Sequence, residues 1–195
     1  MADALSPSWD AGGQYLYFLA STDYALQSGW LDMSSVNIPF TRSLYAIVLS
    51  REGSAPNLPK SDEAEIKSAD GDSAGKTAKD EDSKNGEDTI TVTLHAEGIQ
   101  NRIVNLPLPA RNYTSLSAGP EKTVFIAEDI PNKTGLTLHK YDVEKLEAQS
   151  FAEEVRSFVI SDSGDNILLR QGANWKVGET KSKDASDAKS LEVSL

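Results

Sequence analysis

The sequence of 195 residues contains no cysteine, only two histidines and no long apolar run. The absence of cysteine excludes a disulfide framework, a thiolate zinc site and a cysteine nucleophile. The longest apolar stretch falls far short of the roughly 18–20 residues that a membrane-spanning helix needs, so we expect no membrane partner. Residues 1–8 have neither a basic nor an apolar signal region. We therefore expect no secretory signal in this segment and favour a cytoplasmic location.

Positive charge is also scarce, because 19 basic residues stand against 30 acidic ones, a net charge of −11. Nucleic-acid binding needs clustered Lys and Arg, so we expect no nucleic-acid partner. Residues 51–88 hold 11 acidic and 6 basic residues, no aromatic residue, and mainly alanine among their apolar residues. Such a composition cannot bury enough apolar area to offset a backbone entropy of roughly 1–2 kcal/mol per residue. We predict that residues 51–88 form a disordered acidic insertion.

Elsewhere the apolar pattern has period two, in short segments rich in aromatic and β-branched residues and bounded by turn formers. This pattern is typical of β-strands. The predicted strands are 14–20, 43–50, 89–95, 102–106, 113–118, 123–128, 136–142, 146–150, 155–161, 166–170 and 175–178. Residues 143–154 are the only helix-like window, and a strand–turn–strand reading fits them better. The sequence therefore predicts an all-β fold.

Three segments, 7–18, 113–125 and 157–169, share one order of features. In each, a turn carrying Asp or Gly leads into an alternating strand, and the middle copy is degenerate. The last two begin about 44 residues apart, within the 40–50 typical of a four-stranded propeller blade. We predict a partial β-propeller of about three four-stranded antiparallel blades. In this division 1–50 is the first part of a blade, 51–88 the insertion, 89–180 further blades and 181–195 a linker.

Several motifs occur in the order found in one peptidase family. The segment from Pro7 (PSWDAGGQYLYF) resembles the blades of TolB-like and tricorn-type β-propellers. Residues 99–113 (IQNRIVNLPLPARNY) are similar to a stretch that tricorn-type serine peptidases carry in the propeller just before the catalytic core. Residues 138–144 (LHKYDVE) resemble a strand and turn of that family, and 191–195 (LEVSL) its linker into the core. Asp10 is the only carboxylate of the first turn, fewer than the family pattern has.

The resemblance implies that this chain is the C-terminal part of a propeller region, with 181–195 leading toward a missing catalytic core. It implies a non-catalytic segment that gates or channels peptide substrates to a downstream proteolytic core of the same polypeptide. The parent would be a serine peptidase whose serine, histidine and oxyanion groups follow this segment. We therefore expect no catalytic, cofactor-binding or metal-binding residue here, and no cofactor.

Two alternatives stay open. One is a TolB-like binding or scaffold propeller without enzymatic activity, and the other is an oligopeptidase whose propeller caps an α/β-hydrolase. Three blades cannot close a ring, since single-ring propellers typically have 4–8. We therefore expect a fragment of a larger protein, without its native N-terminus, that exposes sheet edges. Marginal stability or self-association as a homo-oligomer should follow.

The individual candidate residues favour structural roles. Neither His95 nor His139 neighbours a G-x-S-x-G elbow, so we interpret both as strand-surface or blade-packing residues. Residues 70–81 partly match a calcium loop, but Ala74 stands where Asp or Asn belongs, and we interpret the match as chance. Asn112 and Asn132 begin glycosylation tripeptides by pattern alone.

Three tryptophans and the acidic run complete the candidates. We interpret Trp9 and Trp175 as blade packing, because aromatic residues anchor such sheets. Trp30 lies in a predicted loop, where contact with a neighbouring domain or substrate is the alternative to packing. The acidic run 63–88 is interpreted as a solvated tether rather than as a site for a basic partner.

Overall fold

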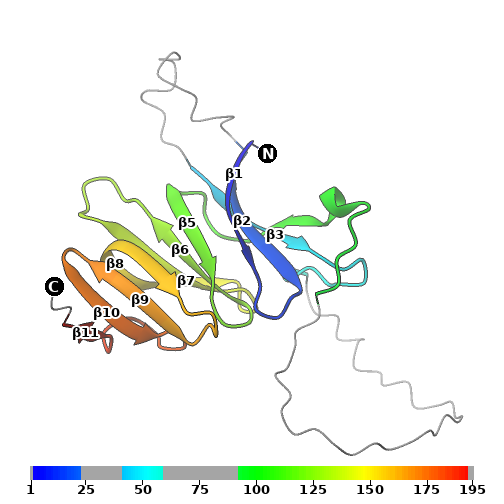
Figure 1. Ribbon diagram of the computed structural model, residues 1–195. Coiled ribbons are helices and arrows are strands. Elements are labelled where there is room, and N and C mark those ends of the chain that lie inside the picture. Colours follow the sequence, from blue (N-terminus) through cyan, green and yellow to red (C-terminus); the bar gives the residue numbers. More distant parts are fainter. Residues whose placement is uncertain (1, 23–40, 59–91, 193–195) are drawn as a thin grey trace, which may run out of the picture.

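The structure, a computed structural model, describes residues 2–22, 41–58 and 92–192. Apart from one short 3-10 helix, all the regular structure in these ranges is β-strand. The strands form two antiparallel sheets, which lie side by side in Figure 1. The predicted all-β fold is therefore confirmed.

The first sheet has four strands in chain order: β1 (Ala2–Trp9), β2 (Tyr15–Ser21), β3 (Ser43–Val48) and β4 (Ile103–Asn105). The short helix η3 (Ile99–Arg102) leads into β4. The acidic stretch belongs to the connection between β3 and β4, which are paired neighbours. Residues 59–88 of the predicted disordered insertion, 51–88, lie outside the described residues.

The second sheet has seven strands in chain order: β5 (Tyr113–Ala118), β6 (Thr123–Glu128), β7 (Leu136–Asp142), β8 (Glu147–Ile160), β9 (Asn166–Gln171), β10 (Asn174–Glu179) and β11 (Lys189–Leu191). The first part of β8 pairs with β7 and the last part with β9. Both pairings shift register near Glu154, whose φ of 56° departs from strand geometry. The sheet is therefore two four-stranded units that share one long strand.

This division defines three blades. The first blade is β1–β4, the second is β5–β7 with β8 up to Glu154, and the third is the rest of β8 with β9–β11. Figure 1 shows the second blade between the other two. The prediction of about three four-stranded antiparallel blades is confirmed.

The strand boundaries show which patterns were informative. The strands β5, β6 and β7 coincide with the predictions, whereas those expected at 146–150 and 155–161 join into β8. The strand predicted at 89–95 is wrong over its described part, 92–95, which pairs with no strand. Val92 and Leu94 are 46% and 53% exposed there, so alternation alone did not produce a strand. The strands β1 and β11 were not predicted, and β11 lies within the segment expected to be a linker.

Each of the three sequence repeats contains the turn that joins the first and second strands of one blade. In the first turn the Gly13 N–H donates to the Asp10 carbonyl (2.9 Å), and in the last the Gly164 N–H donates to the Ser161 carbonyl (2.8 Å). Both glycines have positive φ, 68° and 77°, which glycine adopts at little steric cost. The degenerate middle turn places Lys122 at φ 58° instead.

Two apolar seams hold the blades together. The first seam, between the first and second blades, buries Tyr15, Tyr17, Leu19, Leu44, Ala46, Val48, Leu116, Val124, Ile126, Tyr141 and Val143. The second seam, between the second and third blades, buries Phe125, Ala127, Leu138, Phe151, Val155, Ile167 and Leu169. Successive side chains of β6 alternate between the two seams, as a strand's period of two requires. The strand β6 is thus buried on both faces.

A half-buried lysine adds a polar link across the second seam. The Lys140 ammonium on β7 donates to the carbonyls of Thr180 (2.7 Å) and Ser182 (3.0 Å) in the loop after β10. Burial lowers the pKa of Lys140. The two carbonyls replace part of the hydration that the ammonium loses, and they fix this loop against the second blade.

Two tyrosines of the first seam give a matched stability test. The Tyr113 hydroxyl donates to the Pro109 carbonyl (3.0 Å), whereas the Tyr141 hydroxyl is buried without a partner. We expect Tyr113→Phe to lower the free energy of unfolding by about 1 kcal/mol, and Tyr141→Phe to leave it unchanged or raise it, because an unpaired buried hydroxyl is already destabilising. Urea unfolding of both variants measures this. Equal losses in the two variants would contradict the assignment.

Candidate functional site

The first seam carries polar side chains at both of its ends, and these make it the candidate site. Along its inner edge β1 lies beside β5, and the Ala118 N–H donates to the Ser8 hydroxyl (2.8 Å). Where the turn after β1 meets the turn after β5, the Lys122 N–H donates to the Asp10 carboxylate (3.3 Å). Two side chains of the first blade therefore bind the backbone of the second.

Asp10 is a buried carboxylate, only 5% exposed. Burial raises its pKa, and hydrogen bonds from the Lys122 and Gln14 amides oppose that rise. Burial, with Asp10 as a further cause, also raises the pKa of the neighbouring Tyr17 hydroxyl. The two backbone amides therefore compensate only part of the cost of burying the Asp10 carboxylate.

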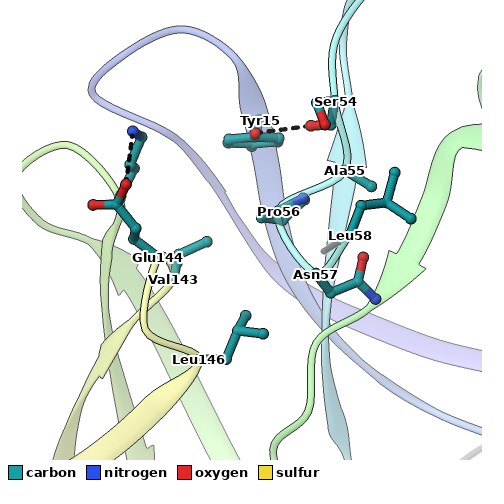
Figure 2. A pocket seen from close by; sticks show the side chains of 10 residues that line it. Tyr15, Ser54, Ala55, Pro56, Asn57, Leu58, Val143, Glu144 and Leu146 are labelled. Atoms are coloured by element: carbon teal, nitrogen blue, oxygen red, sulfur yellow. Dashed lines mark hydrogen bonds and ion pairs between the residues drawn. The ribbon is translucent and has the colours of Figure 1, made fainter. Parts of the chain in front are cut away.

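A cavity of about 570 Å³ opens beside this end of the seam. Figure 2 shows it between the loop 54–58 that follows β3 and the turn 143–146 between β7 and β8. Tyr15 lines it and donates its hydroxyl proton to the Ser54 carbonyl (2.9 Å). Most of the remaining lining is apolar, from Ala55, Pro56, Leu58, Val143 and Leu146.

The chemistry of the cavity suits binding rather than catalysis. Its charged lining residues, Lys122 and Glu144, form an ion pair with a long separation of 3.9 Å. Its volume lies within the roughly 300–1,000 Å³ of small-ligand pockets. The lining combines an apolar interior with a few polar groups, an arrangement that accepts an apolar group and orients it. No histidine lines it among the described residues.

The opposite end of the seam holds a cluster of charged groups. The Glu128 carboxylate at the end of β6 lies 2.6 Å from His139 Nε2 and 3.3 Å from Arg111 Nη1. Glu128 is 6% exposed, and Arg42, also buried, donates to the Tyr113 carbonyl (2.8 Å). A buried carboxylate needs such partners, because leaving its charge uncompensated would be strongly destabilising.

The sequence did not lead us to this cluster, although it contained a signal. Glu128 continues the inward positions of Val124 and Ile126 in the alternating strand, where an apolar residue would be expected. On β7 His139 stands two residues before the inward Tyr141. An acid and a histidine at inward positions of consecutive strands predict a buried pair.

The other residues singled out from the sequence lie apart from one another. His95 Nδ1 accepts from the Arg51 N–H (3.2 Å) in the region after β3. Trp9 is 55% exposed, and the Arg170 guanidinium lies 5.4 Å above the Trp175 ring. The Asn112 side-chain amide donates to Asp129 (3.3 Å).

Asn132 is exposed in the turn after β6, with a positive φ of 66°. Trp30 and the calcium-like loop at 70–81 lie outside the described residues. Within the described ranges, no three His, Asp or Glu side chains converge in a way that could hold a metal ion. Nor does any helix there have the length and apolarity to cross a membrane.

Comparison with known proteins connects this arrangement to a peptidase. No family model matches the sequence. Over 173 residues the chain is 28% identical to a protein named tricorn protease homolog from Saccharolobus solfataricus, an alignment that covers 84% of this chain and 14% of that protein. The chain is related to a segment of the tricorn proteases.

The crystal structure of the tricorn protease gives the corresponding structural match. Its TM-score is 0.59 at 13% identity, covering 98% of this chain and 17% of that chain. At this identity the match bears on the fold alone, and it agrees with blades of propeller type. The chain thus spans about a sixth of the tricorn relatives it matches. Together, the sequence and structural similarities support a peptidase-associated propeller segment.

The buried Asp10 gives a pH-dependent prediction. Because burial raises its folded-state pKa above the ordinary 3.8, the folded protein holds the proton more tightly than the unfolded chain. Its contribution to stability is therefore greatest at low pH and falls as the pH rises through the raised pKa. Asp10→Asn removes this ionisation. We expect the stability of the wild type relative to Asp10→Asn to decrease from acid to neutral pH, as measured by urea unfolding, and a constant difference would contradict the assignment.

Proposed function

We propose that the chain is the non-catalytic propeller segment of a tricorn-like serine peptidase, and that it gates or channels peptide substrates to a proteolytic core of the same polypeptide. The observation that carries the proposal is the similarity to the tricorn protease homolog over 84% of this chain. Its partners would be peptides and that core, and we propose a cytoplasmic location.

The inner edge of the blades is chemically suited to a passage for peptides. In a propeller the blades surround a central channel. The first strands of the first two blades, β1 and β5, lie side by side. They carry short hydroxyl side chains at Ser8, Thr114, Ser115 and Ser117, and Thr114 is exposed. Small polar side chains restrict the width of a passage without selecting a particular sequence.

The partners of the histidines support placing the chemistry elsewhere in the polypeptide. A serine nucleophile needs an imidazole within hydrogen-bond reach. His139 is paired with the Glu128 carboxylate, and His95 accepts from a backbone amide. Neither of these partners is a serine hydroxyl, and the proposed peptidase residues would follow this segment.

A binding or scaffold propeller of the TolB-like kind is the second candidate. The cavity beside Tyr15 favours it, since an apolar pocket of about 570 Å³ has the size of a ligand site. In that case the protein would hold an apolar group and catalyse nothing.

The reading frame beyond Leu195 decides between these candidates. We expect the extended protein to hydrolyse a fluorogenic peptide and to lose that activity when a downstream serine is replaced. The 195-residue chain by itself should show no hydrolysis. An extension that adds only more blades would overturn the peptidase proposal in favour of a binding propeller. A G-x-S-x-G elbow in an α/β-hydrolase domain would favour the oligopeptidase alternative.

The gating role needs a variant that narrows the passage. In the extended protein we expect Thr114→Trp to reduce kcat/KM several-fold for a long unstructured peptide but not for a dipeptide substrate, because only the long chain has to pass the inner strands. Thr134→Trp is the matched control, since Thr134 is exposed in the turn between β6 and β7. Equal effects of Thr114→Trp on both substrates would count against gating.

A further inference from the structure

The second seam ends in a polar pocket of about 330 Å³. On β7, Lys140 and Asp142 follow Leu138 at every second position, so they lie on the face that the seam buries further along the strand. Their cross-strand partners on β8, Gln149 and Glu147, line the pocket as well. The loop after β10 completes the lining from the third blade. We call this hollow the lysine pocket.

Lysines dominate the lining of the lysine pocket, although the chain as a whole is acidic. Four of its eight lining residues are lysines and two are acids, in a chain of net charge −11. They come from β7, from the turn after it and from the loop after β10, and they are Lys140, Lys145, Lys181 and Lys183. A hollow lined by charges of one sign raises the local concentration of ions of the opposite sign. The pocket therefore favours an anion.

Hydrogen bonds hold the backbone that carries two of these lysines. The Lys140 ammonium bonds the carbonyls of Thr180 and Ser182, which stand on either side of Lys181 and just before Lys183. This part of the loop is therefore fixed against the second blade. A site whose backbone is already ordered loses little conformational entropy when a ligand binds.

The ammonium groups keep donors for a ligand. An ammonium has three N–H donors, and Lys140 uses two of them on the loop carbonyls. Lys183 forms no ion pair with any residue that the structure describes. Lys145 and Lys181 are exposed, and each pairs with one carboxylate at 3.3 and 3.1 Å. Surface pairs of this kind contribute little, so both lysines can turn toward a bound anion.

We propose that the lysine pocket binds a phosphate group, as free phosphate or as part of a small phosphorylated molecule. The four ammonium groups exceed the two lining carboxylates by two charges, which a doubly charged anion neutralises. Lysine binds phosphate as a point charge. The pocket volume lies within the range of small-ligand sites, which leaves room for a group attached to the phosphate. The inference does not depend on the proposed peptidase role.

Titration of the isotope-labelled 195-residue chain with inorganic phosphate, followed by NMR at constant ionic strength, tests the proposal. We expect saturable shift changes at the amides of 142–149 and 180–183. Chloride at the same ionic strength should leave these amides unchanged. Changes that do not saturate, or that chloride reproduces, would overturn the proposal.

Substitutions of exposed residues test the site without disturbing the fold. We expect Lys183→Gln to weaken phosphate binding several-fold and Glu147→Gln to strengthen it several-fold, because the first removes an attractive charge and the second a repulsive one. The matched control is Lys133→Gln, which removes the same charge from the turn between β6 and β7, at the other end of β7. It should bind phosphate like the wild type. Wild-type affinity in Lys183→Gln, or an equal loss in Lys133→Gln, would contradict the site.

Two further ligands identify the chemistry that the pocket recognises. Acetate should bind at least several-fold more weakly than phosphate, since it carries a single charge, and equal affinity would overturn the phosphate assignment. Phosphoserine should compete with phosphate for the same amides. Tighter binding of phosphoserine would support a phosphorylated molecule as the ligand, and weaker or equal binding would support free phosphate.

Discussion

The burial of β6 on both faces is the constraint on which the rest of the structure depends. A sheet whose two faces are both apolar is stable only when another layer covers each of them. The second blade meets this requirement within the chain, because the first blade covers Val124 and Ile126 while the third covers Phe125 and Ala127. Within the chain, the first seam covers one face of the first blade and the second seam covers one face of the third blade. A smaller cluster of Phe18, Ala20 and Tyr45 is buried on the other face of the first blade. The second blade is the one that a seam covers on each face.

Polar groups determine how the first two blades align. The apolar middle of the first seam provides most of the buried area, but apolar contacts are not directional. Asp10 at one end and Glu128 at the other are buried carboxylates, and each has partners of fixed geometry: the Lys122 amide for the first, His139 and Arg111 for the second. Leaving either carboxylate without its partners would be strongly destabilising. Asp10 therefore fixes the register between the blades at one end through the Lys122 amide, and at the other end Arg42, just before β3, fixes it through the Tyr113 carbonyl of β5.

The sequence predicted the parts of this fold that follow from local patterns. The strands β5–β7 and the Gly-bearing turns were predicted because alternation and turn chemistry act within a few residues. The joining of two predicted strands into β8 was not predicted. It depends on Glu154 adopting a positive φ at the point where β8 changes its partner from β7 to β9. The cavity beside Tyr15 was missed for a similar reason, because it forms only where blades distant in sequence meet. The Glu128–His139 pair lies on the consecutive strands β6 and β7, so its signal was present locally and was overlooked. At 92–95 the alternating pattern was misleading, because these residues form no ladder with a neighbouring strand.

Native-state hydrogen exchange tests most directly whether the seams hold the three blades as consecutive layers. Amides in the middle of β6, which is covered by both seams, should be the slowest to exchange, with those of β7 next and those of β10 and β11 much faster. The amides of β2 and β3, covered by one seam, should lie between these limits. Exchange of β6 as fast as that of β10 would show that the second blade is not held between its neighbours, and it would contradict the account.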